Sequence, residues 1–347
     1  MTVMLGVMGE TGPGSRRNVG RRPVRGAKPT HVPGEHQPVM VSELIQTLAP
    51  APGETAVDAT LGGGGTSAAL LQHVLPGGRV LALDRDPAAV AQAALRFEGV
   101  GTAFQAVVAS FSDLEALVDR EELRADVVVM DLGISSIQLD DPERGFSFQA
   151  DGPLDMRLNP VDGGPTAADL LADMDGDGLA RLLSEFGQER HARAISRAVV
   201  ERRRTAPVLR TTELAALCAA AIPRRLWPPH IHPATRTFLA LRIAVNNELE
   251  ELRLGISAAV QILRPGGRLG IISFHSLEDT VAKRSLHNLA LNCVCPPQQP
   301  ICTCAHRATL YLPHRKAIRP TEEEVARNPR ARSALLRTAV KLAAPAP

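Results

Sequence analysis

The chain has 347 residues, of which 44% are hydrophobic and 22% are charged, a composition typical of a soluble globular protein with one large domain or two smaller ones. No apolar run approaches the roughly 20 residues that span a bilayer, and the first residues lack the apolar segment of a signal peptide, so we expect a cytoplasmic protein. Lysine and arginine number 39 against 37 acidic residues, a balance that neither requires nor excludes a nucleic-acid partner. Aromatic residues make up only 3%, which argues against a broad base-stacking platform.

Residues 1–30 are rich in glycine, proline and arginine and show almost no apolar periodicity. Such a segment cannot bury enough apolar surface to fold, so we expect a disordered basic tail. Its arginines could contact RNA phosphates, and an extension without a function explains the composition equally well.

Residues 36–141 alternate short apolar runs with helical patterns. Helices are expected over 66–75 and 87–97, where alanine and leucine recur at helical spacing. The intervening apolar runs predict strands at 55–61, 78–84, 102–109 and 125–133. This alternation predicts an α/β fold with a doubly wound, mostly parallel sheet.

From residue 142 to residue 235 the strand patterns disappear and helical patterns take their place, as at 179–204 and 211–222. We interpret 142–235 as an inserted helical subdomain for RNA recognition. The sheet domain is then assembled from residues 31–141 and 236–347.

The sheet is expected to resume after one long helix over 237–263, which the sequence Arg-Pro-Gly-Gly ends. A further strand follows at 268–274. Two short strands at 314–320 and 333–342 flank a polar turn, and we expect them to close the sheet as an antiparallel hairpin.

Four consecutive glycines, Gly62–Gly65, follow the first expected strand. Glycine adopts positive φ without strain and lets a ligand approach the backbone closely. A loop for nucleoside triphosphates needs a lysine after the glycines, and none is present here. The dinucleotide pattern G-x-G-x-x-G is matched only weakly, because Gly62 and Gly64 fit but Ser67 occupies its third glycine position. The sequence therefore indicates a nucleoside-type ligand rather than a triphosphate.

Acidic residues close three of the expected strands: Asp58, Asp84 and Asp131. Asp84 is placed to accept hydrogen bonds from ribose hydroxyls, which NAD and S-adenosylmethionine both carry. We expect Asp58 to reach a methionine ammonium group and Asp131 to meet a substrate amine. Because ligands of open α/β sheets bind at the carboxyl ends of strands, this set favours a methyltransferase over a nicotinamide dehydrogenase.

Several long strings of the chain closely resemble the ribosomal RNA small subunit methyltransferase H family. The resemblance covers about residues 36–341. It is carried by VDATLGGGGTS, LALDRDP, DLGISSIQLDDPERGFSF, DGPLDMR, HPATRTFLALRIAVNNELEEL, GGRLGIISFHSLED and NPRARSALLR.

The resemblance implies a class I methyltransferase fold and transfer of a methyl group from S-adenosyl-L-methionine to N4 of a cytosine in the decoding region of 16S rRNA, within the small ribosomal subunit. Thr66 departs from the family pattern, where many members carry histidine, and its hydroxyl can still donate a hydrogen bond. The positions that match the family's donor-binding residues are Gly64, Gly65, Thr66, Asp84, Phe111, Asp131 and Gln138.

The absence of a suitable cysteine separates two routes of cytosine methylation. Methylation at C5 needs a cysteine nucleophile, and Cys218 falls inside a predicted helix. Methylation at N4 needs an acceptor that holds the amine N–H, and we assign this catalytic role to Asp131. Phe146, Phe148 and His275 are candidates for holding the base, with core or capping roles equally open.

Five arginines in 191–204 could contact RNA phosphates or simply form a solvated helix face, and the sequence does not choose between them. They are Arg193, Arg197, Arg202, Arg203 and Arg204.

Four of the five cysteines lie within twelve residues, as Cys293, Cys295, Cys302 and Cys304. Zinc is one candidate ligand, but C-x-C pairs are less typical than C-x2-C pairs. We therefore predict reduced thiols and no metal site. A nicotinamide dehydrogenase and a non-catalytic subunit assembly factor remain the rival functions.

Overall fold

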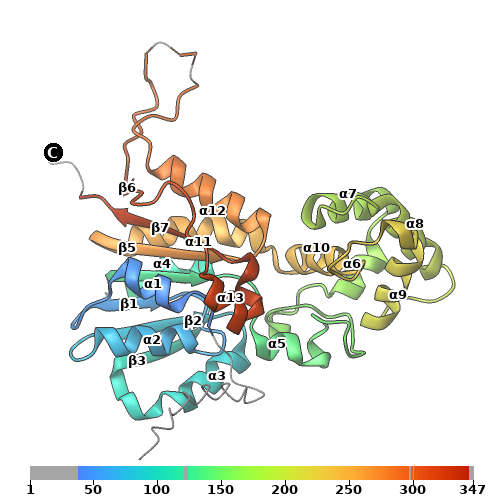
Figure 1. Ribbon diagram of the computed structural model, residues 1–347, viewed down its shortest axis with the longest axis horizontal. Helices are drawn as coiled ribbons and strands as arrows, with labels where there is room; N and C mark the ends of the chain where they lie inside the picture. Colours follow the sequence, from blue (N-terminus) through green and yellow to red (C-terminus); the bar gives the residue numbers. More distant parts are fainter. Residues whose placement is uncertain (1–37, 121–123, 297, 300, 344–347) are drawn as a thin grey trace, which may run out of the picture. The chain divides into compact units, whose positions relative to one another are not determined.

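In the computed structural model, which describes residues 38–120, 124–296, 298–299 and 301–343, seven strands of the described chain form one sheet in the order β3-β2-β1-β4-β5-β7-β6 (Figure 1). Strands β3, β2, β1, β4 and β5 pair in parallel, whereas β7 is antiparallel to β5 and to β6. This arrangement confirms the predicted doubly wound, mostly parallel sheet. The strands are β1 Thr55–Asp58, β2 Arg79–Asp84, β3 Phe104–Val108, β4 Ala125–Asp131, β5 Leu263–Ser273, β6 Leu310–Tyr311 and β7 Leu335–Lys341.

Helices cover both faces of the sheet, which explains why the central strands are continuous apolar runs. Alternate strand residues point to opposite faces: Val128 and Met130 join one hydrophobic cluster, Val127 and Val129 the other. The first face packs against α4 Leu114–Arg120, α11 Glu248–Ile262 and α12 Ser276–Leu289. The second packs against α1 Val41–Leu48, α2 Gly65–Val74 and α3 Pro87–Arg96.

A separate hydrophobic cluster lies in the helical part of the chain, where apolar side chains of α7, α8 and α10 meet. Phe238 and Leu241 of α10 belong to it, so α10 packs with the insert and not with the sheet. By their contacts, residues 36–347 nevertheless form one compact unit. The predicted domain boundaries stay a prediction. The helices here are α5 Ser136–Asp140, α6 Ala167–Asp173, α7 Gly176–Gly187, α8 Ala192–Arg203, α9 Thr211–Ala221 and α10 Thr235–Asn246.

Two sequence predictions were wrong. The single long helix is broken into α10 and α11 at Asn247, whose left-handed φ of 50° ends one helix and starts the next. The expected C-terminal hairpin does not form: the segment 314–320 contributes one isolated bridge, Ile318 to Leu336, while β7 pairs with β5 and β6. The polar turn instead contains helix α13, Glu322–Arg327.

The basic tail expected at residues 1–30 lies outside the described residues. Within the described part, no helix is both long and apolar enough to cross a membrane.

Candidate active site

A cavity of about 350 Å³ opens at the carboxyl ends of the parallel strands. The loop after β1, the ends of β2, β4 and β5, and the start of α11 all contribute to its wall. The strand order reverses between β1 and β4, and the crevice at such a reversal is where open α/β sheets bind ligands. The cavity is therefore the candidate active site.

The glycine loop forms one wall of the cavity through Gly62, Gly63 and Gly65. A Cβ on Gly65 would lie 2.7 Å from the Pro38 ring, so no larger residue fits there without movement. Gly64 has φ of +74° and precedes α2 as its N-cap residue. It does not line the cavity, and a Cβ added there would approach the Phe97 ring at 3.0 Å. Gly64 therefore contributes to the conformation of the glycine loop and not to the surface of the cavity.

Asp84, at the end of β2, lines the cavity and binds the glycine loop. Its Oδ2 accepts a hydrogen bond from the Gly62 N–H at 2.8 Å, and its Oδ1 accepts one from the Asp86 N–H at 2.9 Å. Burial raises the pKa of Asp84 to about 6, although these two hydrogen bonds oppose the shift. Each carboxylate oxygen can accept a further hydrogen bond, so ribose hydroxyls still have acceptors here.

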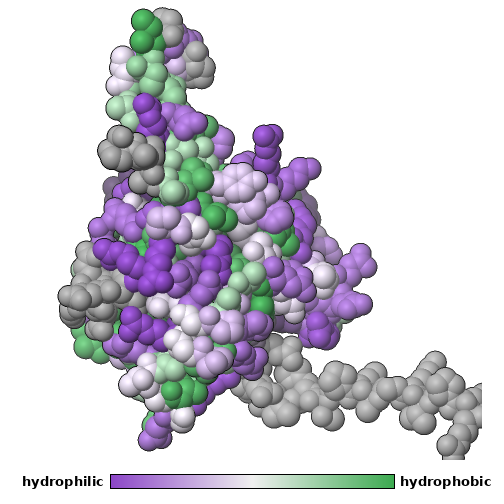
Figure 2. All heavy atoms as spheres, turned by 90° about the vertical axis from the view of Figure 1, so that its left-hand side faces the viewer, coloured by the Kyte–Doolittle hydropathy of each residue, from purple (hydrophilic) through white to green (hydrophobic). Residues whose placement is uncertain are grey.

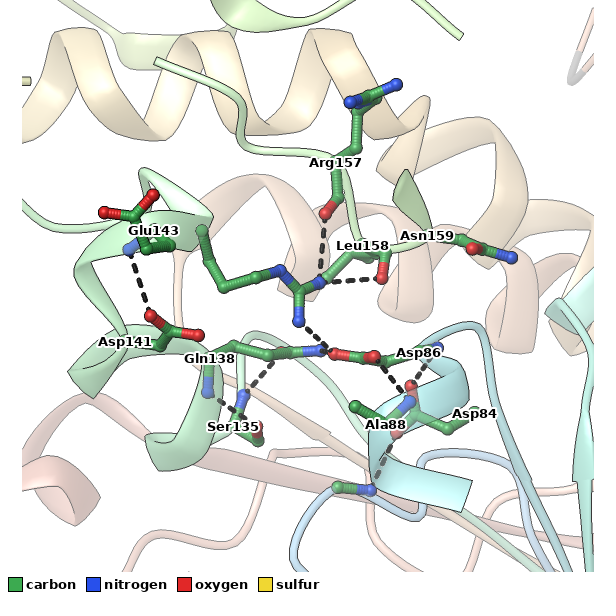
Figure 3. Close-up of polar contacts among 12 residues, drawn as sticks. Asp84, Asp86, Ala88, Ser135, Gln138, Asp141, Glu143, Arg157, Leu158 and Asn159 are labelled. Atoms are coloured by element: carbon green, nitrogen blue, oxygen red, sulfur yellow. Dashed lines mark hydrogen bonds and ion pairs between the residues drawn. The ribbon is translucent and has the colours of Figure 1, made fainter. Parts of the chain in front are cut away.

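Gln138, a predicted donor contact, lines the cavity, but its side-chain amide binds protein groups (Figure 3). Its Nε2 donates to Asp86 Oδ2 at 2.9 Å, and its Oε1 accepts from the Ser135 N–H at 3.0 Å. Arg144 forms an ion pair with the same Asp86 carboxylate at 2.6 Å. Gln138 therefore fixes the loop after β4 to the start of α3; its contact with a ligand stays a prediction.

Two more of the predicted donor positions, Thr66 and Phe111, line the cavity. Thr66 lies in the first turn of α2 and is only 4% exposed. Phe111 packs against α11, where a Cβ on Gly255 would overlap its side chain. The glycine at 255 thus allows Phe111 to lie close to the helix at the cavity wall.

Asp58 does not line the cavity, contrary to the expectation that it reaches a ligand ammonium group. It is fully buried at the end of β1, where Oδ2 accepts from the Ser67 hydroxyl at 2.6 Å and Oδ1 from the Thr60 N–H at 3.2 Å. Burial raises the pKa of this carboxyl. Asp58 therefore holds the glycine loop together from inside.

Asp131, at the end of β4, lines the cavity, and its N–H donates to Thr60 Oγ1 at 2.6 Å. Its Oδ1 is buried and has no hydrogen-bond partner among the described residues. Burial raises the pKa of Asp131 well above its ordinary value, and the charges of Asp58 and Glu278 raise it further. Because a buried polar atom without a partner costs about 1–3 kcal/mol, Oδ1 marks a position where a ligand group can bind.

Beside Asp131 lies a network of charged side chains that the sequence analysis missed. Arg242 of α10 makes two hydrogen bonds of 2.8 Å to Glu248 and lies 3.7 Å from Glu278. His275 Nε2 lies 3.0 Å from Glu278 Oε1. Burial acts to raise the pKa of Glu278, but His275 and then the Arg242 charge outweigh it, and the pKa is lowered. Glu278 therefore carries a negative charge close to Asp131.

Ligand atoms of Glu248, His275 and Glu278 lie within 4.8 Å of one another, a geometry that a metal ion could use. The Arg242 guanidinium already pairs with both carboxylates, so their charge is balanced without a metal. The only sequence signals for this network were the quoted strings NNELEEL and FHSLED, which do not show that residues far apart in the chain meet.

Of the three base-holding candidates, only His275 lines the cavity. Phe146 is 7% exposed inside the helical cluster, and the Phe148 ring packs against Phe238 at 4.8 Å between centroids. Phe274, which the sequence analysis did not single out, does line the cavity. The phenylalanines that line the cavity are therefore Phe111 and Phe274, which directly follows β5, and not the two of the insert.

The five arginines of 191–204 do not form one free stripe. Arg202 pairs with Glu213 at 2.5 Å, and Arg203 donates to the carbonyls of Leu171 and Met174 at 2.6 and 2.7 Å. The Arg204 side chain pairs with Glu201 at the surface. Arg193 and Arg197, one turn apart on α8, are exposed and form no ion pair among the described residues.

Comparison with known proteins identifies the family of this chain. Proteins described as ribosomal RNA small subunit methyltransferase H from Anaeromyxobacter dehalogenans and Trichlorobacter lovleyi are 49% and 47% identical to this chain over 308 residues, covering 88% of it and 98% of each relative. The relative from Thermomicrobium roseum is 47% identical over 309 residues, 89% of this chain and 94% of its own. A crystal structure of a putative rRNA methylase from Clostridium thermocellum covers 89% of this chain and all of its own at 11% identity, with a TM-score of 0.42 that bears on neither fold nor function.

The family model of the MraW methylases matches residues 34–342, which include the whole sheet, the cavity and the helical insert. With the relatives above covered over nearly their full length, the chain belongs to the MraW methylase family.

Proposed function

We propose that this protein transfers a methyl group from S-adenosyl-L-methionine to the exocyclic N4 of a cytosine in the decoding region of 16S rRNA, within the small ribosomal subunit. The names of the relatives support the rRNA substrate. The observation that carries the amine-directed chemistry is the buried, unpartnered Oδ1 of Asp131 in the cavity wall.

The cavity fits a nucleoside-type methyl donor. Gly62, Gly63 and Gly65 present backbone without side chains to the cavity, and Asp84 offers acceptors for ribose hydroxyls. Phe111 supplies an apolar wall. When bound, the donor's sulfonium provides an electrophilic methyl group, and its positive charge suits a cavity that also contains Asp131 and Glu278.

Asp131 is placed to hold the amine of the target base. In its ionised form, which the positive charge of the bound donor favours, the carboxylate accepts an N–H hydrogen bond and draws the N4 lone pair away from the ring, toward the methyl carbon. As the new C–N bond forms, the C–S bond breaks and its electron pair stays on sulfur. N4 then loses its extra proton to Asp131, whose raised pKa makes it a competent proton acceptor.

The groups around Asp131 complete this proposal. The negative charge of Glu278 helps to keep the Asp131 pKa high, while Arg242, itself paired with Glu248, lies within ion-pair distance of Glu278. Phe274, at the end of β5, takes the base-stacking role that Phe146 and Phe148 cannot fill from the helical core. The exposed Arg193 and Arg197 of α8 supply phosphate contacts to the surrounding RNA.

The test is nucleoside mapping of 16S rRNA by mass spectrometry with and without the gene, together with transfer of labelled methyl groups to purified small subunits. We expect N4-methylated cytidine at one position, present only with the gene. Label at C5, or subunit binding without any transfer, contradicts the proposal; the second outcome is that of a non-catalytic assembly factor. The nicotinamide rival is already removed by membership in a methylase family.

A further inference from the structure

The segment between α12 and β6, residues 290–309, projects from the sheet in Figure 1 and forms the upper protrusion in Figure 2, where hydrophobic colours dominate. None of its described residues is buried. Val294 and Ile301 are 47% and 74% exposed. A segment without its own core needs a cross-link to hold one conformation, and in small folds that link is usually a disulfide or a metal.

The sulfur atoms of four cysteines meet inside this segment. The Cys293, Cys302 and Cys304 sulfurs are separated by 3.4, 3.6 and 3.8 Å, and with Cys295 all four lie within 4.8 Å of one another. A tetrahedral zinc ion with Zn–S bonds of about 2.3 Å places its sulfurs about 3.8 Å apart. Three of the thiols thus already have nearly the spacing of a tetrahedral sulfur site, and the fourth, Cys295, lies within 4.8 Å of them.

The same distances do not fit disulfides, in which the sulfurs are about 2.0 Å apart. The sulfurs are also not grouped in two pairs, because Cys293 is near both Cys302 and Cys304. Two backbone N–H groups point at the sulfurs: Val294 to Cys304 at 3.5 Å and Cys295 to Cys293 at 3.4 Å. Such N–H···S contacts offset the negative charge of a metal-bound thiolate cluster.

We propose that Cys293, Cys295, Cys302 and Cys304 bind one structural zinc ion that fixes the projecting segment. C-x-C spacing is unusual for zinc, which is why the sequence alone favoured reduced thiols and no metal. In the folded chain the two C-x-C pairs lie together, so their unusual spacing in the sequence does not prevent all four thiols from binding one ion. With four protein ligands the site has no open position, so its role is structural and not catalytic.

The test measures metal in the full-length protein, purified under reducing conditions without chelators. We expect one zinc per chain by inductively coupled plasma mass spectrometry, released when a mercurial reagent modifies the thiols. The double variant Cys302→Ser with Cys304→Ser should lose the zinc. Cys218→Ala is the matched control, since Cys218 is buried in the helical cluster and should leave the zinc content unchanged.

A second readout uses cobalt. Replacement of zinc by Co²⁺ should produce the visible bands of tetrahedral sulfur coordination in the wild type and in Cys218→Ala, and not in the double variant. Three results overturn the proposal: a wild-type protein with no zinc and four freely titrating exposed thiols, disulfides in the protein as purified, or zinc retained by the double variant. Retained zinc would point to Glu248, His275 and Glu278 instead.

Discussion

The strands β1 and β4 are neighbours in the sheet, and each ends in an aspartate with a raised pKa, Asp58 buried and Asp131 half-buried. At the end of β1, both Asp58 oxygens accept hydrogen bonds, from Ser67 and Thr60. At the end of β4, Asp131 Oδ1 has no partner among the described residues. The Asp58 carboxyl, with both oxygens hydrogen-bonded, stabilises the loop, whereas Asp131 lines the cavity with one oxygen left for the proposed ligand contact.

The difference arises from the chain that follows each strand. After β1 the chain passes through the glycine loop into α2, whose first turn brings the Ser67 hydroxyl back to Asp58. After β4 the chain turns away through Gly133, at φ +99°, and returns no donor to Asp131 Oδ1. Thr60 links the two ends, since its N–H donates to Asp58 and its hydroxyl accepts from the Asp131 N–H.

Asp84, at the end of β2, combines features of both aspartates: its oxygens accept hydrogen bonds from the chain, and it also lines the cavity. Of the changes compared, its replacement should have the largest effect on donor binding. Asp84→Ala removes acceptors for two ribose hydroxyls, each charge-assisted hydrogen bond contributing about 1.5–3 kcal/mol, so we expect donor affinity to fall at least about 100-fold. Calorimetry measures this directly. Asp84→Asn, which keeps one acceptor for the loop N–H groups, should lose less. Unchanged affinity in the alanine variant would place the ribose elsewhere.

The Asp131→Asn substitution tests the reactive end of the comparison. It keeps size and one acceptor but removes the charge and the proton acceptor, so single-turnover methyl transfer should slow by about 100-fold. Donor affinity should change little. The rate is measured on small subunits at saturating donor. Full recovery of the rate at saturation would move Asp131 from catalysis to donor binding alone.

The Asp58→Ala substitution tests the structural end. It leaves the buried Ser67 hydroxyl and Thr60 N–H without an acceptor, so the free energy of unfolding should fall by about 2–4 kcal/mol in urea titration. The transfer rate at saturating donor should stay near the wild-type value. Ser67→Ala should cost less, because the Thr60 N–H keeps its partner. If Asp58→Ala slowed methyl transfer and left the free energy of unfolding unchanged, Asp58 would not be the structural counterpart of Asp131.

The smallest expected effect is the change of donor affinity with pH. The pKa of Asp84 is raised to about 6, so the carboxyl of the free protein becomes protonated below that pH and loses charge-assisted binding of the ribose. Donor affinity should fall up to about tenfold per pH unit below about pH 6. Asp84→Asn should flatten this dependence. Isothermal titrations over this range measure it, and a wild-type affinity that does not vary with pH would contradict the assignment.

The raised pKa of Asp84 has the opposite consequence for the free energy of unfolding: low pH weakens donor binding but stabilises the fold of the free protein. The folded chain keeps this proton up to about pH 6, whereas the unfolded chain releases it near its ordinary value of 3.8. The Asp84 contribution therefore favours the folded state at low pH and is lost as pH rises through this window.

Much of the sheet and part of the site follow from the sequence, because their signals are local. Apolar runs buried on both faces predict the parallel strands, and acids at strand ends place Asp84 and Asp131 at the ligand-binding edge. The glycine loop is likewise a local signal of close backbone approach, although local pattern does not tell that Gly65 faces the cavity while Gly64 faces Phe97.

The remaining features depend on which distant groups meet. Asp58 and Asp131 look equivalent along the chain, and only the tertiary partners make one a scaffold and the other a candidate catalyst. Arg242 meets Glu278 because α10 and α12 converge on the cavity, and the break at Asn247 that turns α10 toward the insert needs only a single left-handed residue. Hydrogen bonding and charge act over a few ångströms in space, so roles that rest on them are decided by folding and not by spacing in the sequence.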